Sequence, residues 1–398
     1  MKILMVSSFL PFPLYSGGHI RLYNILKNLS SKHKVVLVCE KRNYQTEKDV
    51  GEVAKVCKKV ITVDRKKQWT LDNIIRTGFS SSSFLITGHT NLKMKEEIAT
   101  FLNNNKFDLI HAETFYIMQN IPKTSVPIVL VEHNIEYLVY KRYANTEALF
   151  LRPLLNIDTL KLKKQEEKFW EKANFLVAVS EDEKAMMKNH NKNIAIVPNG
   201  VDVERFKIKD LRIKNENKEK TILFIGNFKW VQNRDSLSWI IKKIWPILKL
   251  KAKSEKLKVK LWIVGKNIPQ KFRGIEGDDI VFDENAPDDT SLIYQKADLL
   301  LAPIRVGGGS SYKILEAMAS GVPVVTTKLG ANPLGAVNNK EIIISEDESE
   351  IGDRIIELFS NEQFYKNISS NARKLIEEKY DWKRITQRLE EVYKTVVN

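Results

Sequence analysis

The sequence predicts an α/β protein made of two Rossmann-like domains, each with a parallel sheet and covering helices. Short apolar runs alternate with longer amphipathic stretches, which is typical of βαβ units. A chain of 398 residues is long enough for about two domains. The polar, lysine-rich stretch 207–220 separates two such alternating series, as expected at a domain boundary.

In the first series, the apolar runs are short enough to be buried strands, and the helical candidates show amphipathic spacing. Strands are expected over residues 2–7, 35–39, 60–63, 109–111, 128–132, 175–180 and 194–198. Helices are expected over residues 18–31, 92–103 and 157–173.

The same pattern restarts after the boundary. Strands are expected over residues 222–226, 258–264, 280–282, 299–302, 324–327 and 342–344. Helices are expected over residues 236–251, 291–296, 312–320, 348–358 and 363–379. Ligands bind at the carboxyl ends of the strands in open α/β sheets, so a cleft between two such edges is the expected site.

The net charge of +15 and the isoelectric point of about 9.4 favour anionic partners, such as phosphorylated substrates or acidic lipids. Nucleic acid is not an expected partner, because no helix-turn-helix, zinc-finger or RNP signature is present. The Lys-rich stretch 161–172 predicts salt-sensitive attachment to an anionic membrane. A generally solvated lysine-rich surface is the competing explanation.

Cys39 and Cys57 belong to no CxxC pair, so both are expected to be reduced, in a cytoplasmic protein. No apolar run approaches the ~18–20 residues that span a bilayer. Residues 1–18 imitate a signal peptide, but Pro11 and Pro13 interrupt the apolar part. A buried first strand explains this segment better.

The strongest local signal for chemistry lies in residues 299–325. Gly307, Gly308 and Gly309 follow a buried strand, and a helix is expected to begin near Ser310 and Ser311. A glycine loop before a helix N-terminus offers free N–H groups to a phosphate. A simple glycine turn in front of a capped core helix is the alternative.

Lys313 lies one turn into this helix, and Glu316 and Tyr312 are expected on the same face. Lys313 adds a full positive charge near a phosphate, and the carboxylate can accept hydrogen bonds from two ribose hydroxyls. The alternative is a solvated Lys–Glu pair. The residues expected to hold the helix on the sheet are Ile314, Leu315 and Met318.

A second glycine loop, Gly17 and Gly18, follows the first strand and precedes a helix that carries His19 and Arg21. It is another candidate anion site, although a Gly-Gly pair after a strand is often only a turn.

Two histidines follow neighbouring strands. His133 comes directly after the apolar run IVLVE, and His111 follows the run that ends at Ile110. A histidine at a strand end can donate to a phosphate or hold a sugar hydroxyl. At least one of the two is expected in a site, while a satisfied core histidine is the alternative for either.

Several motifs together resemble the family 4 glycosyltransferases of the GT-B fold. They occur in the family's order, and with the final stretch YDWKRITQRLEEVY they cover nearly the whole chain. The motifs are the first strand with SGG, EHNIEY, VPNGVD at residues 197–202 and KILEAMASGVPVV at residues 313–325.

The resemblance implies an N-terminal acceptor domain over residues 1–205 and a C-terminal donor domain over residues 206–378. A final helix over residues 379–398 is expected to cross back to the first domain. The implied activity is transfer of a sugar from a nucleoside-diphosphate donor, with retention of configuration and without a metal or other cofactor.

Matched to the family's motifs, Glu316 corresponds to the glutamate that holds the donor ribose. His133 resembles the histidine near the donor sugar and phosphate. Gly17 and Gly18 resemble the loop near the pyrophosphate and the acceptor. The donor base is expected against the loop 283–288.

The sequence departs from the family pattern at three positions. Gly308 stands where a glutamate is usual, and Asn227 and Gln232 stand where the family has Arg and Lys. Arg305 and Lys313 flank the glycine loop, and both are expected to point into one site and replace the missing cations.

The predicted function is therefore a hexosyltransferase that uses a UDP- or GDP-linked sugar. The expected acceptor is a glycan or lipid-linked sugar of a polysaccharide pathway in the cell envelope, reached at the inner membrane face. A non-catalytic nucleotide-sugar-binding subunit and a sugar-nucleotide epimerase are the competing predictions. The donor-binding residues are expected to be Glu316, Gly307, Gly308, Gly309, Ser310, Ser311, Tyr312 and Asn227, and the catalytic residues His133, Lys313 and Arg305.

Overall fold

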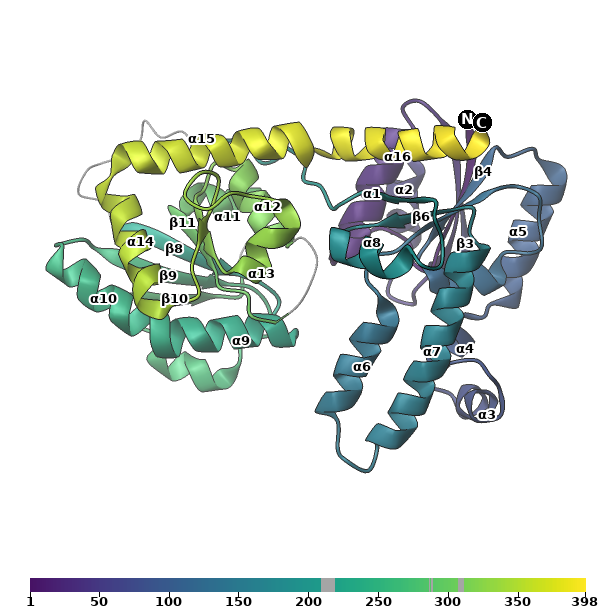
Figure 1. Cartoon of the computed structure of the whole chain (residues 1–398), viewed down its shortest axis with the longest axis horizontal. Coiled ribbons are helices and arrows are strands. Elements are labelled where there is room, and N and C mark those ends of the chain that lie inside the picture. The colour runs from purple at the N-terminus through teal and green to yellow at the C-terminus, as the bar shows by residue number, and fades with distance from the viewer. Residues whose placement is uncertain (209–218, 286, 288, 307–310) are drawn as a thin grey trace. The chain divides into compact units, whose positions relative to one another are not determined.

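The computed structural model describes residues 1–208, 219–285, 287, 289–306 and 311–398, apart from the side chain of Thr146. The chain divides into two compact units (Figure 1). The first unit contains Met1–Pro198 and Ile385–Asn398, and the second contains Asn199–Arg384. The division falls at Asn199, inside the VPNGVD motif, whereas the sequence places the boundary after residue 205.

The first unit is built on a parallel seven-stranded sheet with the order β3-β2-β1-β4-β5-β6-β7. The strand order reverses between β1 and β4, which marks the carboxyl edge of these two strands as the expected ligand position. The strands are β1 (Lys2–Ser7), β2 (Lys34–Lys41), β3 (Lys59–Asp64), β4 (Leu109–Glu113), β5 (Ile128–Val131), β6 (Phe175–Ala178) and β7 (Ile194–Ile196).

Helices cover this sheet, and two of them, α6 and α7, form a hairpin that extends beyond it (Figure 1). The short helices α2, α3, α4, α6 and α8 are not predicted by the sequence. The elements are α1 (Gly17–Leu29), α2 (Glu47–Ala54), α3 (Leu71–Phe79), α4 (Phe84–His89), α5 (Leu92–Asn104), η1 (Phe115–Asn120), α6 (Glu136–Thr146), α7 (Arg152–Lys172) and α8 (Glu181–Met187).

The second unit has a parallel six-stranded sheet with the order β10-β9-β8-β11-β12-β13, which reverses between β8 and β11. Its strands all coincide with predicted ones, give or take two residues at their ends. They are β8 (Lys220–Ile225), β9 (Val259–Val264), β10 (Ile280–Asp283), β11 (Leu299–Ala302), β12 (Val324–Thr326) and β13 (Ile343–Ile344).

The helix expected over residues 236–251 begins earlier and is interrupted. A π turn, η3 (Ile240–Ile244), connects α9 (Val231–Trp239) to α10 (Trp245–Ser254). Pro246 in the first turn of α10 lacks the N–H that a continuous α-helix needs, and the wider turn accommodates it. The other elements are η4 (Gln270–Ile275), α11 (Ser291–Lys296), α12 (Tyr312–Ala319), α13 (Lys328–Ala331), η5 (Asn332–Leu334), α14 (Glu348–Ser360), α15 (Glu362–Lys379) and α16 (Trp382–Val397).

The two halves of the VPNGVD motif belong to different units, and each half is held by contacts within its own unit. In the first unit, buried Arg21 donates to the carbonyls of Val197 and Pro198, both at 2.8 Å. In the second unit, a Cβ on Gly200 would lie 2.9 Å from the ring of Trp382, so only glycine fits there. Packing within each unit therefore constrains the motif at Val197, Pro198 and Gly200.

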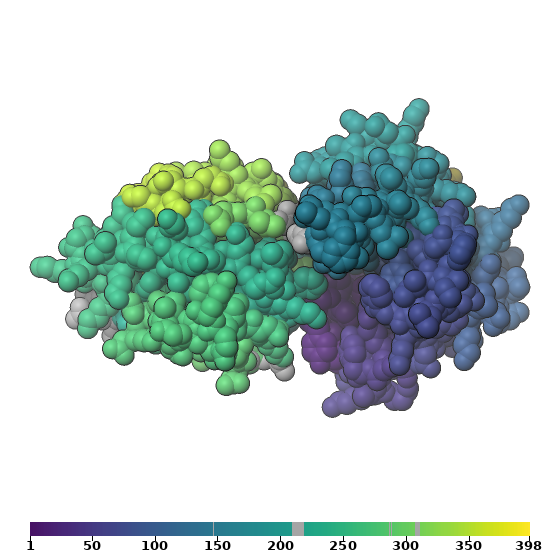
Figure 2. All heavy atoms as spheres, turned by 90° about the horizontal axis from the view of Figure 1, so that it is seen from below, coloured from purple at the N-terminus to yellow at the C-terminus, as the bar shows by residue number. Residues whose placement is uncertain are grey.

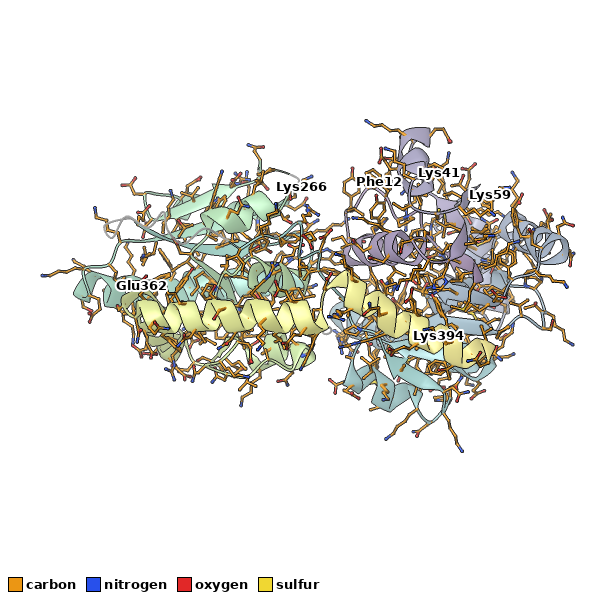
Figure 3. The ribbon with its side chains drawn as sticks, turned by 90° about the horizontal axis from the view of Figure 1, so that it is seen from above. Phe12, Lys41, Lys59, Lys266, Glu362 and Lys394 are labelled. Atoms are coloured by element: carbon orange, nitrogen blue, oxygen red, sulfur yellow. The ribbon has the colours of Figure 1, made fainter. Side chains whose placement is uncertain are left out.

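Positive charge is spread over both units. Lys59 on β3, Lys266 after β9 and Lys394 on α16, all labelled in Figure 3, have exposed side chains. None of the helices in the described ranges combines the length and the apolar composition that crossing a membrane would require.

Candidate functional site

The second unit places Lys313 and Glu316 beside the carboxyl ends of β8 and β11. Both side chains are half-buried on α12. The predicted division of the helix into two faces is confirmed. The residues on its sheet face are fully buried: Ile314, Leu315 and Met318.

The carboxyl of Glu316 is surrounded by polar neighbours. The Tyr294 hydroxyl donates to its Oε2 at 3.1 Å and to the carbonyl of Lys313 at 3.2 Å. Burial raises the pKa of the Glu316 carboxyl to about 7, although the Tyr294 hydroxyl and the nearby Arg205 guanidinium act in the opposite direction. Arg205 is itself paired with Asp289 at 2.9 Å. Near neutral pH the carboxyl can therefore be converted by a ligand into a full hydrogen-bond acceptor.

Lys313 extends from α12 toward the end of β8 and the first turn of α9. Its Nζ donates to Asn233 Oδ1 at 2.8 Å and lies 4.8 Å from the centre of the Phe224 ring. Burial lowers the pKa of this ammonium to about 7, while Glu316 opposes the shift. A phosphate placed beside it would stabilise the charged form.

Asn227 lies in the loop after β8 and contacts the same Asn233. Its carbonyl accepts from Asn233 Nδ2 at 2.8 Å, and its Oδ1 accepts from Asn267 Nδ2 at 3.0 Å. The loops after β8 and β9 come very close here, since a Cβ on Gly265, whose φ is +140°, would lie 1.8 Å from the carbonyl oxygen of Gly226. The structure thus brings Asn227 and Lys313 together through Asn233.

Arg305 has a different environment from Lys313. Its guanidinium makes a two-point ion pair with Asp235, at 2.8 and 3.1 Å, and lies 4.4 Å from the Trp239 ring centre. In this structure Arg305 is therefore paired with Asp235, whereas Lys313 is bonded to Asn233. That Arg305 and Lys313 point into one site and replace the missing cations stays a prediction. The pairing depends on tertiary contacts that the sequence does not reveal.

Part of the predicted phosphate loop is not among the described residues. Gly307, Gly308, Gly309 and Ser310 lie outside the described residues. Ser311 is the N-cap of α12, with a half-buried side chain that makes no capping bond, and Tyr312 is half-buried. In the predicted base-binding loop, residues 286 and 288 are also outside the description.

The first unit carries a second polar cluster, at the carboxyl ends of β4 and β5. Glu113 accepts from both His111 and His133, the latter at 2.5 Å between Oε1 and Nε2. His111 Nδ1 lies 2.6 Å from the Tyr393 hydroxyl on α16. His111 and Glu113 are fully buried, whereas His133 keeps 17% of its side chain exposed. His111 is therefore a core histidine, and His133 is the one that reaches a surface.

The ionisation of Glu113 is maintained by its neighbours. Burial by itself would raise the pKa of this carboxyl, but His133 and His111 together hold it well below its usual range. The next residue, Thr114, has φ of +71°, a strained value for a β-branched side chain. Such strain is common at functional strand ends.

Gly17 and Gly18, predicted as a loop, are the first residues of α1, and Gly18 lies against His133. A Cβ on Gly18 would be 3.3 Å from His133 Nδ1 and 3.4 Å from the Phe9 ring. His19, the next residue of α1, has its Nδ1 2.6 Å from Ser16 Oγ. Burial lowers the pKa of His19 to about 4, and Arg42 and His133 make smaller contributions in the same direction. The prediction that Arg21 belongs to an anion site here is corrected, because its guanidinium donates to the carbonyls of Val197 and Pro198 instead.

Sequence reasoning missed several of these residues. Glu113 could have been found, because it is two residues after His111 on the same strand and so shares its face. Asn233, Tyr294 and Tyr393 gave no local signal, since their roles depend on contacts with distant segments.

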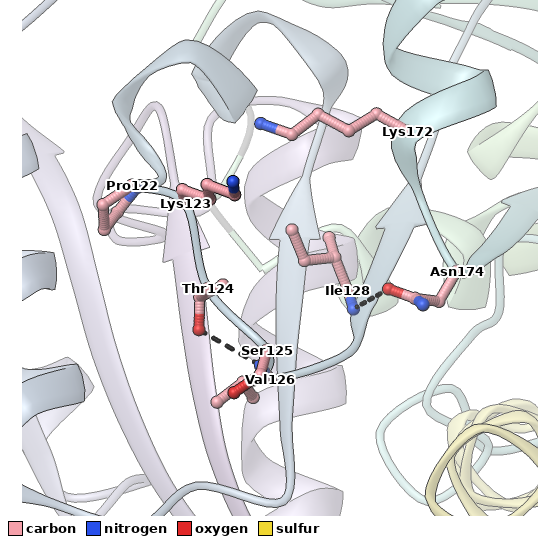
Figure 4. A pocket seen from close by; sticks show the side chains of 8 residues that line it. All are labelled: Pro122, Lys123, Thr124, Ser125, Val126, Ile128, Lys172 and Asn174. Carbon is pink, nitrogen blue, oxygen red and sulfur yellow. Dashed lines mark hydrogen bonds between the residues drawn. The ribbon is translucent and has the colours of Figure 1, made fainter.

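A hollow of about 560 Å³ lies at the start of β5, the edge of the first sheet opposite to His133 (Figure 4). Asn174 Oδ1 accepts from the backbone N–H of Ile128 inside it, at 2.8 Å. Ligands of open α/β sheets bind at the carboxyl ends of the strands, so this hollow is not a candidate for the donor or acceptor site.

Comparisons with known proteins agree with the fold. The family described as "Glycosyltransferase Family 4" matches residues 15–205, and "Glycosyl transferases group 1" matches residues 219–361. An uncharacterized 44.6 kDa protein in the cps region of Klebsiella pneumoniae is 25% identical over 96% of this chain and 97% of its own. The N-acetyl-alpha-D-glucosaminyl L-malate synthase of Bacillus anthracis is 25% identical over 52% of this chain and 55% of its own.

Solved structures show the same architecture. Sucrose-phosphate synthase of Thermosynechococcus elongatus superposes with a TM-score of 0.68 at 15% identity, covering 99% of both chains. HepE of Anabaena, in complex with UDP and glucose, gives a TM-score of 0.62 at 17% identity over 99% of this chain and 100% of its own. With its two parallel Rossmann-like sheets and its two adjoining family matches, the chain belongs to the family 4 (group 1) glycosyltransferases of the GT-B fold.

Proposed function

We propose that the chain transfers a hexose from a UDP- or GDP-linked donor to a glycan or lipid-linked acceptor, with retention of configuration and without a metal. The observation that carries the proposal is the Lys313–Glu316 pair at the carboxyl edge of the second sheet. The pair offers a cation for the diphosphate and a carboxyl for the ribose, one helical turn apart.

In this proposal Glu316 accepts hydrogen bonds from the two ribose hydroxyls. Lys313 and the N-terminus of α12 stabilise the negative charge that grows on the diphosphate as the glycosidic bond breaks. Arg305 assists less, because its charge is shared with Asp235. His133, held by Glu113, contacts the donor sugar or phosphate, and Gly17 and Gly18 at the start of α1 lie beside it.

The donor class rests on the likeness to HepE, whose structure holds UDP, so UDP is the first nucleotide to test. The likeness to a protein of the Klebsiella cps region supports an acceptor in envelope polysaccharide synthesis. Peripheral attachment to the membrane would bring the enzyme to a lipid-linked acceptor.

A thermal-shift screen of UDP, GDP and ADP tests the donor site. A nucleotide at about 100 times its dissociation constant adds about 2.7 kcal/mol to the stability of the folded state. The proposal expects a clear rise in Tm with UDP or GDP. No shift with any of the three nucleotides would contradict it.

The second candidate function is a non-catalytic nucleotide-sugar-binding subunit. It is favoured by Asn227 and Gln232 at positions usually held by cations, and by the ion pair that neutralises Arg305. Such a subunit would bind nucleotide sugars but release no nucleoside diphosphate from them.

A further inference from the structure

The first unit exposes large apolar side chains on a helix that has no buried residue. Helix α3 carries Leu71, Ile74, Ile75 and Phe79 on one face, at the i, i+3, i+4 and i+8 spacing of a helical stripe, and Phe79 is 93% exposed. Trp69, just before the helix, is 80% exposed. A soluble surface rarely gathers so many apolar groups in one place.

The end of the α6–α7 hairpin also exposes large apolar side chains. Apolar side chains run from the turn into the first half of α7, and Phe150 at the turn is 81% exposed. The exposed residues of this segment are Leu149, Phe150, Leu151, Leu154, Ile157 and Leu160.

Contacts tie α3 to this part of α7. Lys161 Nζ donates to the carbonyl of Thr77 at 2.7 Å, and Asp158 accepts from the N–H of Phe84 at 2.8 Å. The rings of Phe84 and Trp69 lie 4.6 Å apart. These contacts hold α3 beside α7 near Asp158 and Lys161, so the exposed residues of 69–79 and 149–160 lie on neighbouring segments of the first unit. We call these residues together the α3–hairpin patch, and both segments are part of the face shown in Figure 2.

The surroundings of the patch are basic. Residues 66–79 and 139–164 contain nine Lys or Arg and three Asp or Glu. This excess opposes close pairing with a second copy of the same face, because like charges would meet across the interface. It suits an anionic surface, which attracts each nearby cation by about 1 kcal/mol.

We propose that the α3–hairpin patch docks the protein on an anionic lipid bilayer, with Trp69, Phe79 and Phe150 inserted at the level of the headgroups. Aromatic and aliphatic side chains ringed by Lys and Arg are the composition of interfacial segments that lie on a membrane. The inference rests on exposed side chains and does not depend on sugar transfer. It differs from attachment by the dispersed lysines alone, because apolar insertion resists salt.

The test is co-sedimentation of the full chain with vesicles of phosphatidylethanolamine and phosphatidylglycerol, or of phosphatidylcholine alone. We expect binding to the anionic vesicles that weakens but persists at 0.5 M salt, a concentration at which the Debye length falls to roughly 4 Å. The double variant Phe79→Ser/Phe150→Ser should bind at least about tenfold more weakly.

The matched control is Leu250→Ser/Ile275→Ser, which removes two exposed apolar side chains from the second unit. It should bind vesicles as the wild type does. Equal Tm values for all three proteins would establish that the substitutions leave the fold intact. Trp69→Phe should in addition lose the fluorescence quenching that brominated lipids cause.

Three outcomes would overturn the proposal. One is no sedimentation of the wild type with anionic vesicles at low salt, and another is wild-type binding by the Phe79→Ser/Phe150→Ser variant. The third is a concentration-dependent dimer that this variant dissociates and that vesicles do not, which would assign the patch to a second copy of the chain.

Discussion

Replacing Glu316 by Gln keeps the shape of the side chain and removes its charge. The Tyr294 hydroxyl can still donate to the amide oxygen, so the local packing should persist. A donor ribose would lose a charged acceptor, which is worth roughly 1.5–3 kcal/mol. The dissociation constant of UDP should therefore rise about 10- to 150-fold.

The pH dependence gives this prediction a second, independent readout. The pKa of the Glu316 carboxyl is about 7, so below pH 7 a proton must leave before it accepts two hydroxyls, and affinity falls up to about tenfold per pH unit. The pKa of Lys313 is also about 7, so above pH 7 it must gain a proton to meet the diphosphate. Wild-type affinity should peak near pH 7, and Glu316→Gln should keep only the decline on the alkaline side.

Stability should move in the opposite direction from binding. The pKa of the Glu316 carboxyl in the folded protein lies above its unfolded value of 4.5, so its stabilising contribution is full below pH 4.5 and is lost as the pH rises through 7. Because the side chain is only half-buried, we expect Glu316→Gln to gain about 1 kcal/mol at pH 8, or roughly 2–4 °C in Tm. At pH 4 the gain should vanish.

Titration calorimetry with UDP at pH 6, 7 and 8, together with thermal unfolding, measures both effects. Glu362→Gln at the start of α15, labelled in Figure 3, is the matched control and should change neither. Unchanged UDP affinity in Glu316→Gln would refute the ribose role. Weaker binding accompanied by a lower Tm at pH 8 would show structural damage instead.

Three further predictions concern catalysis. Lys313→Ala should lower the single-turnover rate at saturating UDP-sugar by about 10²–10³-fold. Arg305→Ala should lower this rate by clearly less, because Arg305 is already paired with Asp235. Equal losses in the two variants would contradict this difference. Glu113→Gln should loosen His133 and lower turnover with little change in UDP affinity, and an unchanged rate would remove His133 from the mechanism. EDTA should leave transfer unchanged, and loss of activity that magnesium restores would contradict a metal-free reaction.

Most of the secondary structure could be predicted from the sequence, because buried parallel strands appear as short apolar runs. The strands β1 to β13 all fall on predicted runs. Helices such as α3, with nine residues, and α8, with seven, were missed because they are too short for a clear helical period. The π turn over Ile240–Ile244 was missed because the amphipathic pattern continues through it.

The candidate site divides in the same way. Lys313 and Glu316 were predicted because their spacing on one helix fixes their shared face. The neutralisation of Arg305 by Asp235 could not be predicted, since these residues are 70 positions apart in the chain. The Glu113 contact with His133 likewise joins the end of β4 to the segment that follows β5.

The measurement that tests the central claim most directly is nucleoside diphosphate release from UDP- and GDP-sugars, with and without a lipid-linked glycan acceptor, followed by the anomeric configuration of the product. We expect acceptor-dependent release from one donor class and a product that keeps the donor's anomeric configuration. Nucleotide-sugar binding without any release would identify a non-catalytic subunit. Conversion of the donor sugar without an acceptor would identify an epimerase, and either result would contradict the account.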